Sequence, residues 1–223
     1  MTAGVRVVRD LLDEAVQRLE HGVSRLGLDI GEAAMDSIRV HLDLLTKWNR
    51  AYNLTAIDDP SRAVAAHVLD SLAVCAHLEG QRVIDVGTGA GFPGLPLAFA
   101  RSELDFVLLD SRGKKIRFVE AVIRATGAAN VETVQERVER YPGNDKFDTL
   151  VARAFSSLVQ LYQGSRHLLG PRARILAMKG EYPDDELRAL GAVATLRCEV
   201  VPLDVPYLDA ARHLVIIEPR IES

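Results

Sequence analysis

The sequence predicts an α/β fold in which a mostly parallel sheet of seven strands follows a helical segment at the N-terminus. Residues 1–80 repeat apolar side chains at helical spacing, which indicates amphipathic helices. Residues 81–223 instead alternate short apolar runs with helical stretches, the pattern of a parallel sheet with crossover helices. A glycine-rich loop directly follows the first of these runs, as is typical of open α/β sheets where a strand leads into a helix.

The composition is that of one folded unit. The chain has 223 residues, of which 48% are hydrophobic, and we expect residues 1–80 and 81–223 to form one compact body. No apolar run approaches the ~18–20 residues that cross a bilayer, and charges interrupt the N-terminus where a secretory leader is apolar. Cys75 and Cys198 lack the spacing of a zinc site or a disulfide framework. We therefore expect a cytoplasmic protein with neither a metal nor a membrane partner.

Three helices are predicted in the N-terminal segment. The first spans residues 7–26, and the second spans residues 32–48 with apolar side chains at helical spacing. The third begins after Asp59, with Pro60 suited to a first helical turn, and runs to residue 78. Together they form a helical extension in front of the sheet.

The sheet is predicted from seven short apolar runs in the C-terminal part. Helical stretches separate most of these runs, so neighbouring strands should be parallel. The connection between the last two runs, from Pro202 to Pro206, has no helical pattern and predicts an antiparallel hairpin at the sheet edge. The predicted strands are residues 82–86, 105–110, 131–135, 147–152, 173–178, 195–202 and 212–218.

The glycine-rich loop predicts a cofactor site. Glycine stands at positions 87, 89, 91 and 94, directly after the first strand. Alternate glycines permit positive φ angles and let backbone N–H groups approach a ligand closely. Asp110 ends the next strand, where nucleotide-binding folds place an acid that accepts hydrogen bonds from ribose hydroxyls. Gly87, Gly89 and Asp110 are therefore predicted cofactor contacts.

Two cofactors are compatible with this loop. Residues 89–94 match the G-x-G-x-x-G pattern of NAD sites. Three features favour S-adenosylmethionine instead. The loop begins two residues earlier, with Gly87, and Asp85 places a carboxylate near a cationic ligand, where it would repel a pyrophosphate. Pro93 and Pro96 also remove N–H donors that a dinucleotide needs at the start of the helix.

Residues 112–124 are strongly basic, with five basic residues and one acid. On a helix, Lys114, Arg117 and Arg124 share one face, opposite an apolar stripe. Such a face is either simply solvated or binds phosphate groups, and an RNA substrate would favour the second interpretation. If the substrate is RNA, these three residues and Lys115 are its predicted contacts, although the net charge of −4 argues against non-specific coating of nucleic acid.

Seven short motifs, spread over nearly the whole chain, carry a family resemblance. They are residues 53–55, 67–72, 83–94, 108–111 followed by Lys114 and Lys115, then 153–155, 179–180 and 212–215. With these residues the chain resembles the bacterial 16S rRNA guanine-N7 methyltransferase family known as RsmG or GidB. One departure is Ala66, where many relatives have arginine, which puts a phosphate contact from this position in doubt.

The resemblance implies a class I S-adenosylmethionine-dependent methyltransferase, which is Rossmann-like and carries an N-terminal helical extension. It implies N7 of a guanine in the decoding-region loop of 16S rRNA as the target. The partner would be the 16S rRNA or the assembling small ribosomal subunit, with no obligatory protein partner. Carried over to this sequence, the cofactor contacts would be Gly87, Phe92, Val138, Glu139 and Arg153.

The residues at the strand ends favour catalysis by positioning. Arg153 ends the fourth strand, where amino-group methyltransferases carry an Asn/Asp-Pro-Pro-aromatic motif, and neither cysteine lies in the Pro-Cys motif of a covalent mechanism. Methylation of guanine N7 needs neither motif, because the N7 lone pair is already nucleophilic and has only to be aligned with the methyl group. Arg153 is thus the predicted catalytic residue, and it would hold the methionine carboxylate, a phosphate or guanine O6.

Other polar residues leave alternatives open. Lys179 ends the fifth strand, on the side where α/β sheets bind substrates, and is predicted to contact an RNA phosphate. His67 and Asp70 share a helix face, either as a functional pair or in structural hydrogen bonds. The alternative functions are methylation of another RNA or of a small molecule, and RNA binding without catalysis. A small-molecule enzyme would not need the basic face, and a binding module would not need Asp85, the glycine loop and Asp110 together.

Overall fold

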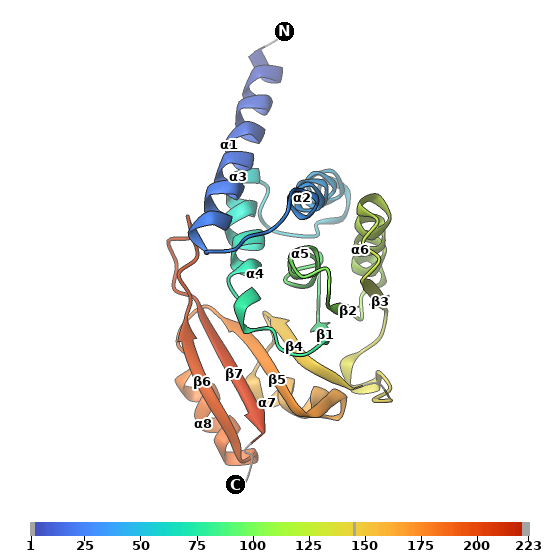
Figure 1. The fold of residues 1–223 in the computed structure, drawn as a ribbon, viewed down its shortest axis with the longest axis vertical. Helices are drawn as coiled ribbons and strands as arrows, with labels where there is room; N and C mark the ends of the chain where they lie inside the picture. The colour runs from blue at the N-terminus through green and yellow to red at the C-terminus, as the bar shows by residue number, and fades with distance from the viewer. Residues whose placement is uncertain (1–2, 145, 220–223) are drawn as a thin grey trace.

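A sheet of seven strands forms the centre of the computed structural model, which describes residues 3–144 and 146–219 (Figure 1). Its strands are β1 (Arg82–Val86), β2 (Asp105–Leu109), β3 (Val131–Val134), β4 (Phe147–Arg153), β5 (Leu169–Lys179), β6 (Leu196–Pro202) and β7 (His213–Pro219). Their order is β3-β2-β1-β4-β5-β7-β6, with β7 antiparallel to both of its neighbours and all other pairs parallel. The predicted fold class and the antiparallel hairpin at the sheet edge are therefore confirmed.

β5 begins earlier than the sequence predicts. Leu169 already pairs with Phe147 of β4, and the register then shifts, so that Thr149 pairs with Arg174. This irregularity accommodates Pro171, a residue type that normally interrupts a strand. The proline therefore concealed the first part of β5 in the sequence.

Helices cover both faces of the sheet (Figure 1). One layer contains α2 (Glu32–Tyr52), α5 (Gly94–Ala100) and α6 (Gly113–Thr126), and the other contains α7 (Leu158–Ser165) and α8 (Asp184–Val193). Two 3₁₀ turns, η3 (Val138–Arg140) and η4 (Arg166–Leu168), follow β3 and α7.

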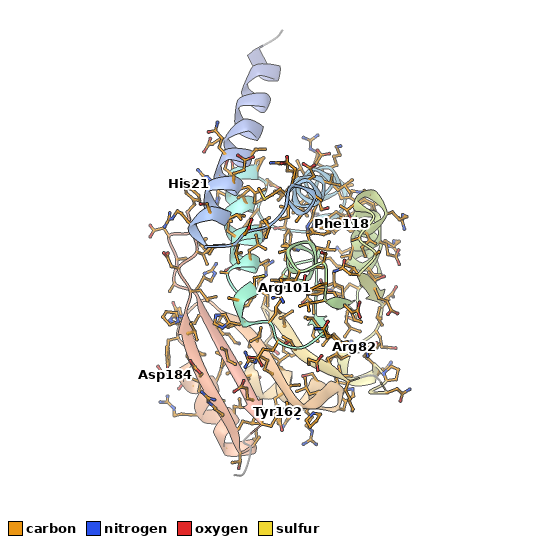
Figure 2. All side chains as sticks on the ribbon, viewed as in Figure 1. His21, Arg82, Arg101, Phe118, Tyr162 and Asp184 are labelled. Carbon is orange, nitrogen blue, oxygen red and sulfur yellow. The ribbon has the colours of Figure 1, made fainter. Side chains whose placement is uncertain are left out.

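Successive side chains of the central strands point to opposite layers, as the pleat of a strand requires. Val83 and Phe106 belong to the cluster that contains α5 and α6, whereas Ile84 and Val107 belong to the cluster that contains α7 and α8. Phe118 of α6, labelled in Figure 2, is fully buried in the first of these clusters. Because both faces are covered, the strands read as continuous apolar runs in the sequence.

The helix predicted over residues 60–78 is divided in the structure. It consists of α3 (Pro60–Ala63), a π-helix η1 (Val64–Leu69), α4 (Asp70–Leu72) and a 3₁₀ turn η2 (Cys75–His77). π-helical turns are rare and often occur at functional sites. This one contains His67 and leads directly to Asp70.

The N-terminal segment and the sheet share one apolar core. α1 (Ala3–Arg25), whose first turns extend beyond the body in Figure 1, packs its second half against η1. Leu19 of α1, Ile38 of α2 and Leu69 of η1 lie in the same buried cluster as Val83 of β1. The helices before β1 are thus joined to the sheet by continuous packing.

Residues 3–144 and 146–219 contain neither a membrane-spanning helix nor a cluster of metal ligands. None of the helices in these ranges combines the length and the apolar character that crossing a membrane requires. The same residues contain no group of three or more histidine, cysteine or acidic side chains that is arranged to hold a metal ion.

Candidate active site

The predicted site residues meet at one edge of the sheet. The carboxyl ends of β1, β2, β4 and β5 lead to the glycine loop, Asp110, Arg153 and Lys179 respectively. Antiparallel β7 begins at this same edge, because His213 pairs with Lys179, and this brings Arg212 alongside. Ligands of open α/β sheets bind outside the carboxyl ends of the strands, so this edge is the candidate active site.

The first two glycines of the loop face open space. Gly87 and Gly89 have φ angles of +77° and +59°. A Cβ built on Gly87 would meet no atom within 4 Å, and one on Gly89 would meet only the Gly87 carbonyl oxygen, at 3.8 Å. Side chains at these positions would project into the space in front of the loop, which a ligand can therefore occupy.

A cavity of about 180 Å³ adjoins this part of the loop. It brings together four of the predicted cofactor contacts, with Phe155 closing one side; they are Gly87, Asp110, Val138 and Glu139. Whole small-molecule sites usually measure ~300–1,000 Å³. The cavity therefore fits one part of a cofactor, and the open face of the loop is available to the rest.

Asp110 organises the loop as well as the cavity. One carboxylate oxygen accepts the Gly89 N–H at 3.0 Å, and the other accepts the Arg112 N–H at 2.8 Å. Carboxylate oxygens have further lone pairs for ribose hydroxyls after these two bonds are made. The cofactor contact predicted for Asp110 remains a prediction, and its support of the loop is a second role that the sequence did not indicate.

Asp85 does not face the ligand side of the loop, contrary to the sequence prediction. Its carboxyl group is fully buried, and Oδ2 accepts the Gly94 N–H at 2.8 Å. Burial raises the pKa of Asp85 to about 6, although the Thr88 hydroxyl and the Gly94 N–H partly oppose the shift. A Cβ on Gly94 would lie 2.6 Å from Oδ2, so only glycine fits above this carboxyl. Asp85 therefore supports the loop and the start of α5.

Phe92 also differs from its predicted role as an apolar wall of the cofactor site. Its ring is 3% exposed and lies between two imidazoles, those of His41 and His67. The ring centroids are 4.5 Å apart for His41 and 4.8 Å apart for His67. The ring is thus committed to packing against the N-terminal helices, and a cofactor contact at this position would use the backbone.

Both stacked histidines are held neutral. Burial lowers the pKa of His41 to about 4, and burial followed by the charge of Arg153 lowers the pKa of His67 to about 4. The Nε2 of His41 donates to the Ala90 carbonyl oxygen at 2.8 Å, which ties α2 to the glycine loop. Sequence reasoning missed His41, and the available signal was a polar residue within the apolar stripe of the second helix.

Arg153 lies in a cluster of charges at the end of β4. Its Nη1 donates to Oδ2 of Asp70 at 3.2 Å and to the Ala66 carbonyl oxygen at 3.0 Å. The other oxygen of Asp70 accepts the Nε–H of Arg212 at 3.0 Å. His67 is not a partner of Asp70; it hydrogen-bonds Thr55 Oγ1 through Nε2 at 2.8 Å. His67 and Asp70 therefore do not form a pair with each other; each makes its own hydrogen bonds.

The backbone directly after Arg153 is strained. Ala154 has a φ of +56°, a left-handed conformation that residues with a Cβ rarely adopt. Strain of this kind concentrates at functional sites, where the surrounding structure holds it. Here the turn at Ala154 leads to Phe155, which lines the cofactor cavity.

Two of the residues predicted to contact RNA make contacts within the protein instead. Lys115 is 9% exposed, and its ammonium group donates to the Leu54 carbonyl oxygen, so it ties α6 to the segment after α2. Lys179 is paired with Glu186 at 2.8 Å, and its side chain is only 13% exposed. Glu186 also accepts the Leu158 N–H at 2.7 Å, and this network holds the turn after β4 in place.

Lys114, Arg117 and Arg124 are exposed along α6. Lys114 is anchored by a 3.3 Å hydrogen bond to the Tyr52 carbonyl oxygen. α6 starts at the active edge, after Asp110, and runs away from it. The contact of this face with RNA remains a prediction.

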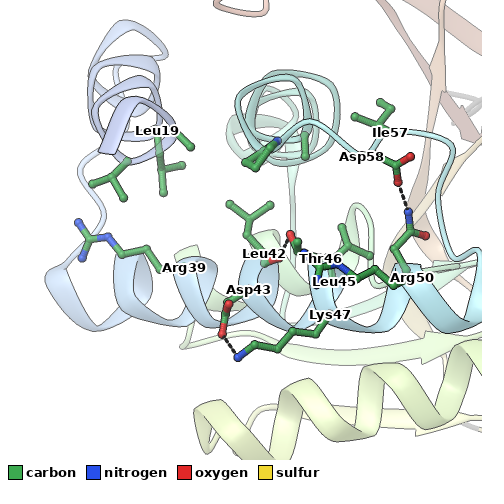
Figure 3. A pocket seen from close by; sticks show the side chains of 15 residues that line it. Leu19, Arg39, Leu42, Asp43, Leu45, Thr46, Lys47, Arg50, Ile57 and Asp58 are labelled. Atoms are coloured by element: carbon green, nitrogen blue, oxygen red, sulfur yellow. Dashed lines mark hydrogen bonds and ion pairs between the residues drawn. The ribbon is translucent and has the colours of Figure 1, made fainter. Parts of the chain in front are cut away.

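A second, more apolar cavity lies in the N-terminal segment (Figure 3). It measures about 490 Å³ and lies between α1, α2 and α3, where Leu19, Leu42, Leu45 and Ile57 line it. None of the glycine-loop residues borders it. We place the active site at the sheet edge, because most of the predicted site residues converge there around the smaller cavity.

Comparison with known proteins identifies the family. A family model described as "rRNA small subunit methyltransferase G" matches residues 34–215. The chain belongs to this family. The ribosomal RNA small subunit methyltransferase G of Nitrosococcus oceani is 46% identical over 202 residues, covering 91% of this chain and 94% of that protein. The Enterobacter sp. protein of the same name is 40% identical, covering 92% of this chain and 99% of that protein.

Solved structures share the fold at low sequence identity. A SAM-dependent methyltransferase from Aquifex aeolicus has a TM-score of 0.59 at 19% identity, covering 74% of this chain and 97% of that chain. The glycopeptide N-methyltransferase MtfA complexed with S-adenosyl-L-homocysteine has a TM-score of 0.60 at 11% identity, covering 69% and 87%. The prediction of a class I methyltransferase fold is thus confirmed.

The rRNA small subunit methyltransferase G family uses S-adenosylmethionine to methylate rRNA, so the predicted cofactor and reaction class are confirmed. The loop fits this cofactor. The first N–H of α5, that of Gly94, is already taken by Asp85, and Pro93 has none. The helix start therefore offers little to a pyrophosphate, whereas S-adenosylmethionine carries no phosphate that would need it.

Proposed function

We propose that this chain transfers a methyl group from S-adenosylmethionine to N7 of a guanine in the decoding-region loop of 16S rRNA. The substrate would be the rRNA itself or the assembling small ribosomal subunit. Because ribosomal subunits assemble in the cytoplasm, the proposal includes that location.

One observation carries the choice of N7. His67 near Arg153 and His41, which stacks on the same Phe92 ring, have pKa values lowered to about 4 and are packed, so they are poor acceptors for a proton. Methylation of an exocyclic amino group loses a proton, whereas the N7 lone pair attacks without losing one. An arginine near neutral, packed histidines suits a reaction that depends on alignment.

Different residues of the chain would bind the cofactor and orient the substrate. S-adenosylmethionine, when bound, supplies an electrophilic methyl group. The open faces of Gly87 and Gly89 would admit the cofactor, Asp110 would accept hydrogen bonds from its ribose, and Val138 with Glu139 would contact its adenine. Arg153 would orient the substrate at the end of β4.

Charge also has to be balanced in this reaction. Methylation at N7 leaves a positive charge on the guanine base, and an unpaired guanidinium nearby would oppose that charge. Asp70, buried and hydrogen-bonded to Arg153, offsets the positive potential. The carboxylate therefore suits N7 chemistry beside an arginine.

A labelling experiment tests the proposal. The purified chain is incubated with tritiated S-adenosylmethionine and small subunits from a strain that lacks this methylation, and in parallel with deproteinised 16S rRNA. Borohydride reduction followed by aniline then cleaves RNA at 7-methylguanosine, and primer extension locates the break. We expect cleavage in the decoding-region loop. Methyl incorporation without cleavage would overturn the N7 assignment, and cleavage elsewhere would overturn the target loop.

A further inference from the structure

Asp70, Arg153 and Arg212 form a charged cluster that joins three parts of the chain. Asp70 is in α4, Arg153 ends β4, and Arg212 directly precedes β7. The carboxylate of Asp70 is 3% exposed, and each of its oxygens accepts a hydrogen bond from a different arginine, at 3.2 and 3.0 Å. One buried carboxylate thus fixes two guanidinium groups next to each other.

Each guanidinium group has N–H donors that make no hydrogen bond within the part of the chain that the structure describes. Arg153 uses Nη1 for its two hydrogen bonds, and Arg212 uses Nε for Asp70 and Nη1 for the Ala211 carbonyl oxygen. Within residues 3–144 and 146–219, Nη2 of either arginine and Nε of Arg153 make no hydrogen bond. Their side chains are 22% and 24% exposed, so these donors are within reach of a ligand. Guanidinium groups match the oxygens of a phosphate in geometry and charge.

The cluster lies on the substrate side of the sheet edge. The cofactor cavity is bordered by residues in or after β1, β2 and β3 and by Phe155 after β4, whereas the cluster extends from α4 and the end of β4 to the residue before β7. β7 is three strands away from β1, which is ~14 Å at the usual strand spacing. An anion bound between the two arginines therefore belongs with the substrate more readily than with the cofactor.

We propose that Arg153 and Arg212 together bind a phosphodiester group of the rRNA substrate, and that Asp70 is the positioning residue that aligns them. The inference rests on the proposed function in taking RNA as the substrate. Two unpaired guanidinium groups would repel each other, and Asp70 removes that repulsion while leaving the cluster a net positive charge. The shared carboxylate keeps the outer edges of both groups directed to one anion.

The first test separates RNA phosphate from the other anion available, the carboxylate of S-adenosylmethionine. Arg212→Gln and Arg212→Lys are compared with a matched control, Arg188→Gln, which removes an exposed arginine that pairs with Asp185. Affinity for 16S rRNA is measured at several salt concentrations, and affinity for S-adenosylmethionine by titration calorimetry.

We expect Arg212→Gln to weaken RNA binding about tenfold, since a charge-assisted hydrogen bond is lost. The slope of log K against log salt should fall by about 0.7–0.9, and cofactor affinity should stay within twofold. Arg212→Lys keeps the charge and should restore the slope, and Arg188→Gln should behave as wild type. An unchanged slope in Arg212→Gln, or weakened cofactor binding with unchanged RNA binding, would overturn the proposal.

The second test concerns Asp70. If Asp70 aligns Arg212, then Arg212→Gln should reduce RNA affinity less in an Asp70→Asn background than in wild type, and the two changes should not be additive. Full additivity would overturn the positioning role. Should Asp70→Asn fail to fold, the Arg212 variants alone decide the phosphate site. These binding measurements do not depend on which guanine atom is methylated, so failure of the N7 assignment is seen separately in the cleavage assay.

Discussion

Individual glycines in the loop perform different tasks. Gly87 and Gly89 leave open the space in front of the loop, whereas Gly94 allows the buried carboxyl of Asp85 to approach the backbone. The same residue type therefore leaves open space in the first half of the loop and allows close packing in the second half.

Gly87→Ala tests the access role. The new Cβ meets no protein atom, so the cost to stability is the left-handed strain alone, about 1–2 kcal/mol. Gly127→Ala is the matched control, because Gly127 has a φ of +70° and also open space, at the end of α6. Thermal melts should show similar losses for both variants, while calorimetry should show lost S-adenosylmethionine binding for Gly87→Ala only. Equal cofactor affinities in the two variants would contradict the placement of the site.

Arg153→Ala tests catalysis by alignment. We expect kcat to fall ~100-fold, the scale expected for a reactant displaced by about 1 Å. The wild-type rate should show no rise between pH 6 and 8 that titrates with a side chain, because N7 requires no general base. Single-turnover rates across this pH range provide the measurement, and a bell-shaped or rising profile would speak for proton abstraction instead.

At the scale of elements, α6 presents two different faces of positive charge. Lys115 points inward to the Leu54 carbonyl oxygen, while Lys114, Arg117 and Arg124 are exposed. The inward lysine connects α6 to the segment after α2. The outward residues remain free of ion pairs within residues 3–144 and 146–219, and are available to an anionic partner.

Replacing the three outward residues by glutamine should weaken RNA binding. Each phosphate contact that is lost should lower the slope of log K against log salt by about 0.7–0.9. Lys115→Met is the contrasting variant: it should cost stability by roughly 1–3 kcal/mol, through the unpaired carbonyl oxygen, and leave the slope unchanged. If the triple variant keeps the wild-type slope, this face of α6 is only solvated.

At the scale of the whole molecule, the N-terminal helices complete the active edge. They supply Asp70 to the arginine cluster, and His41 and His67 to the stack on Phe92. The core that joins these helices to the sheet is continuous. The catalytic edge is therefore built jointly by the segments before and after the first strand.

The histidine stack makes global stability depend on pH. The folded-state pKa values of His41 and His67 are about 4, below the usual 6.5, so the unfolded chain binds more protons between these values. Each histidine thus contributes up to about 3 kcal/mol above pH 6.5, which is lost as pH falls toward 4. Denaturant titrations should show a shallower pH dependence for His67→Gln than for wild type. An equally steep pH dependence in His67→Gln would contradict this contribution.

The sequence by itself determined the order of helices and strands, the glycine loop, the cofactor class and the family. The elements, the glycine loop and the preference for S-adenosylmethionine follow from local patterns, because apolar periodicity, glycine spacing and an acid at a strand end are visible within short windows of the chain. The family follows from the resemblance carried by seven short motifs. The antiparallel hairpin was also predictable, because the connection between its strands has no helical pattern.

Only the tertiary structure decided which polar residues face the ligand. Asp85 and Lys115 carry charges that local patterns assign to a site, but the packing of α5 and of the segment after α2 buries them. Asp70 and Arg212 are 142 positions apart, and they meet because β7 runs antiparallel back to the active edge. Contacts between distant segments depend on the path of the whole chain, and one sequence without its fold does not contain that geometry.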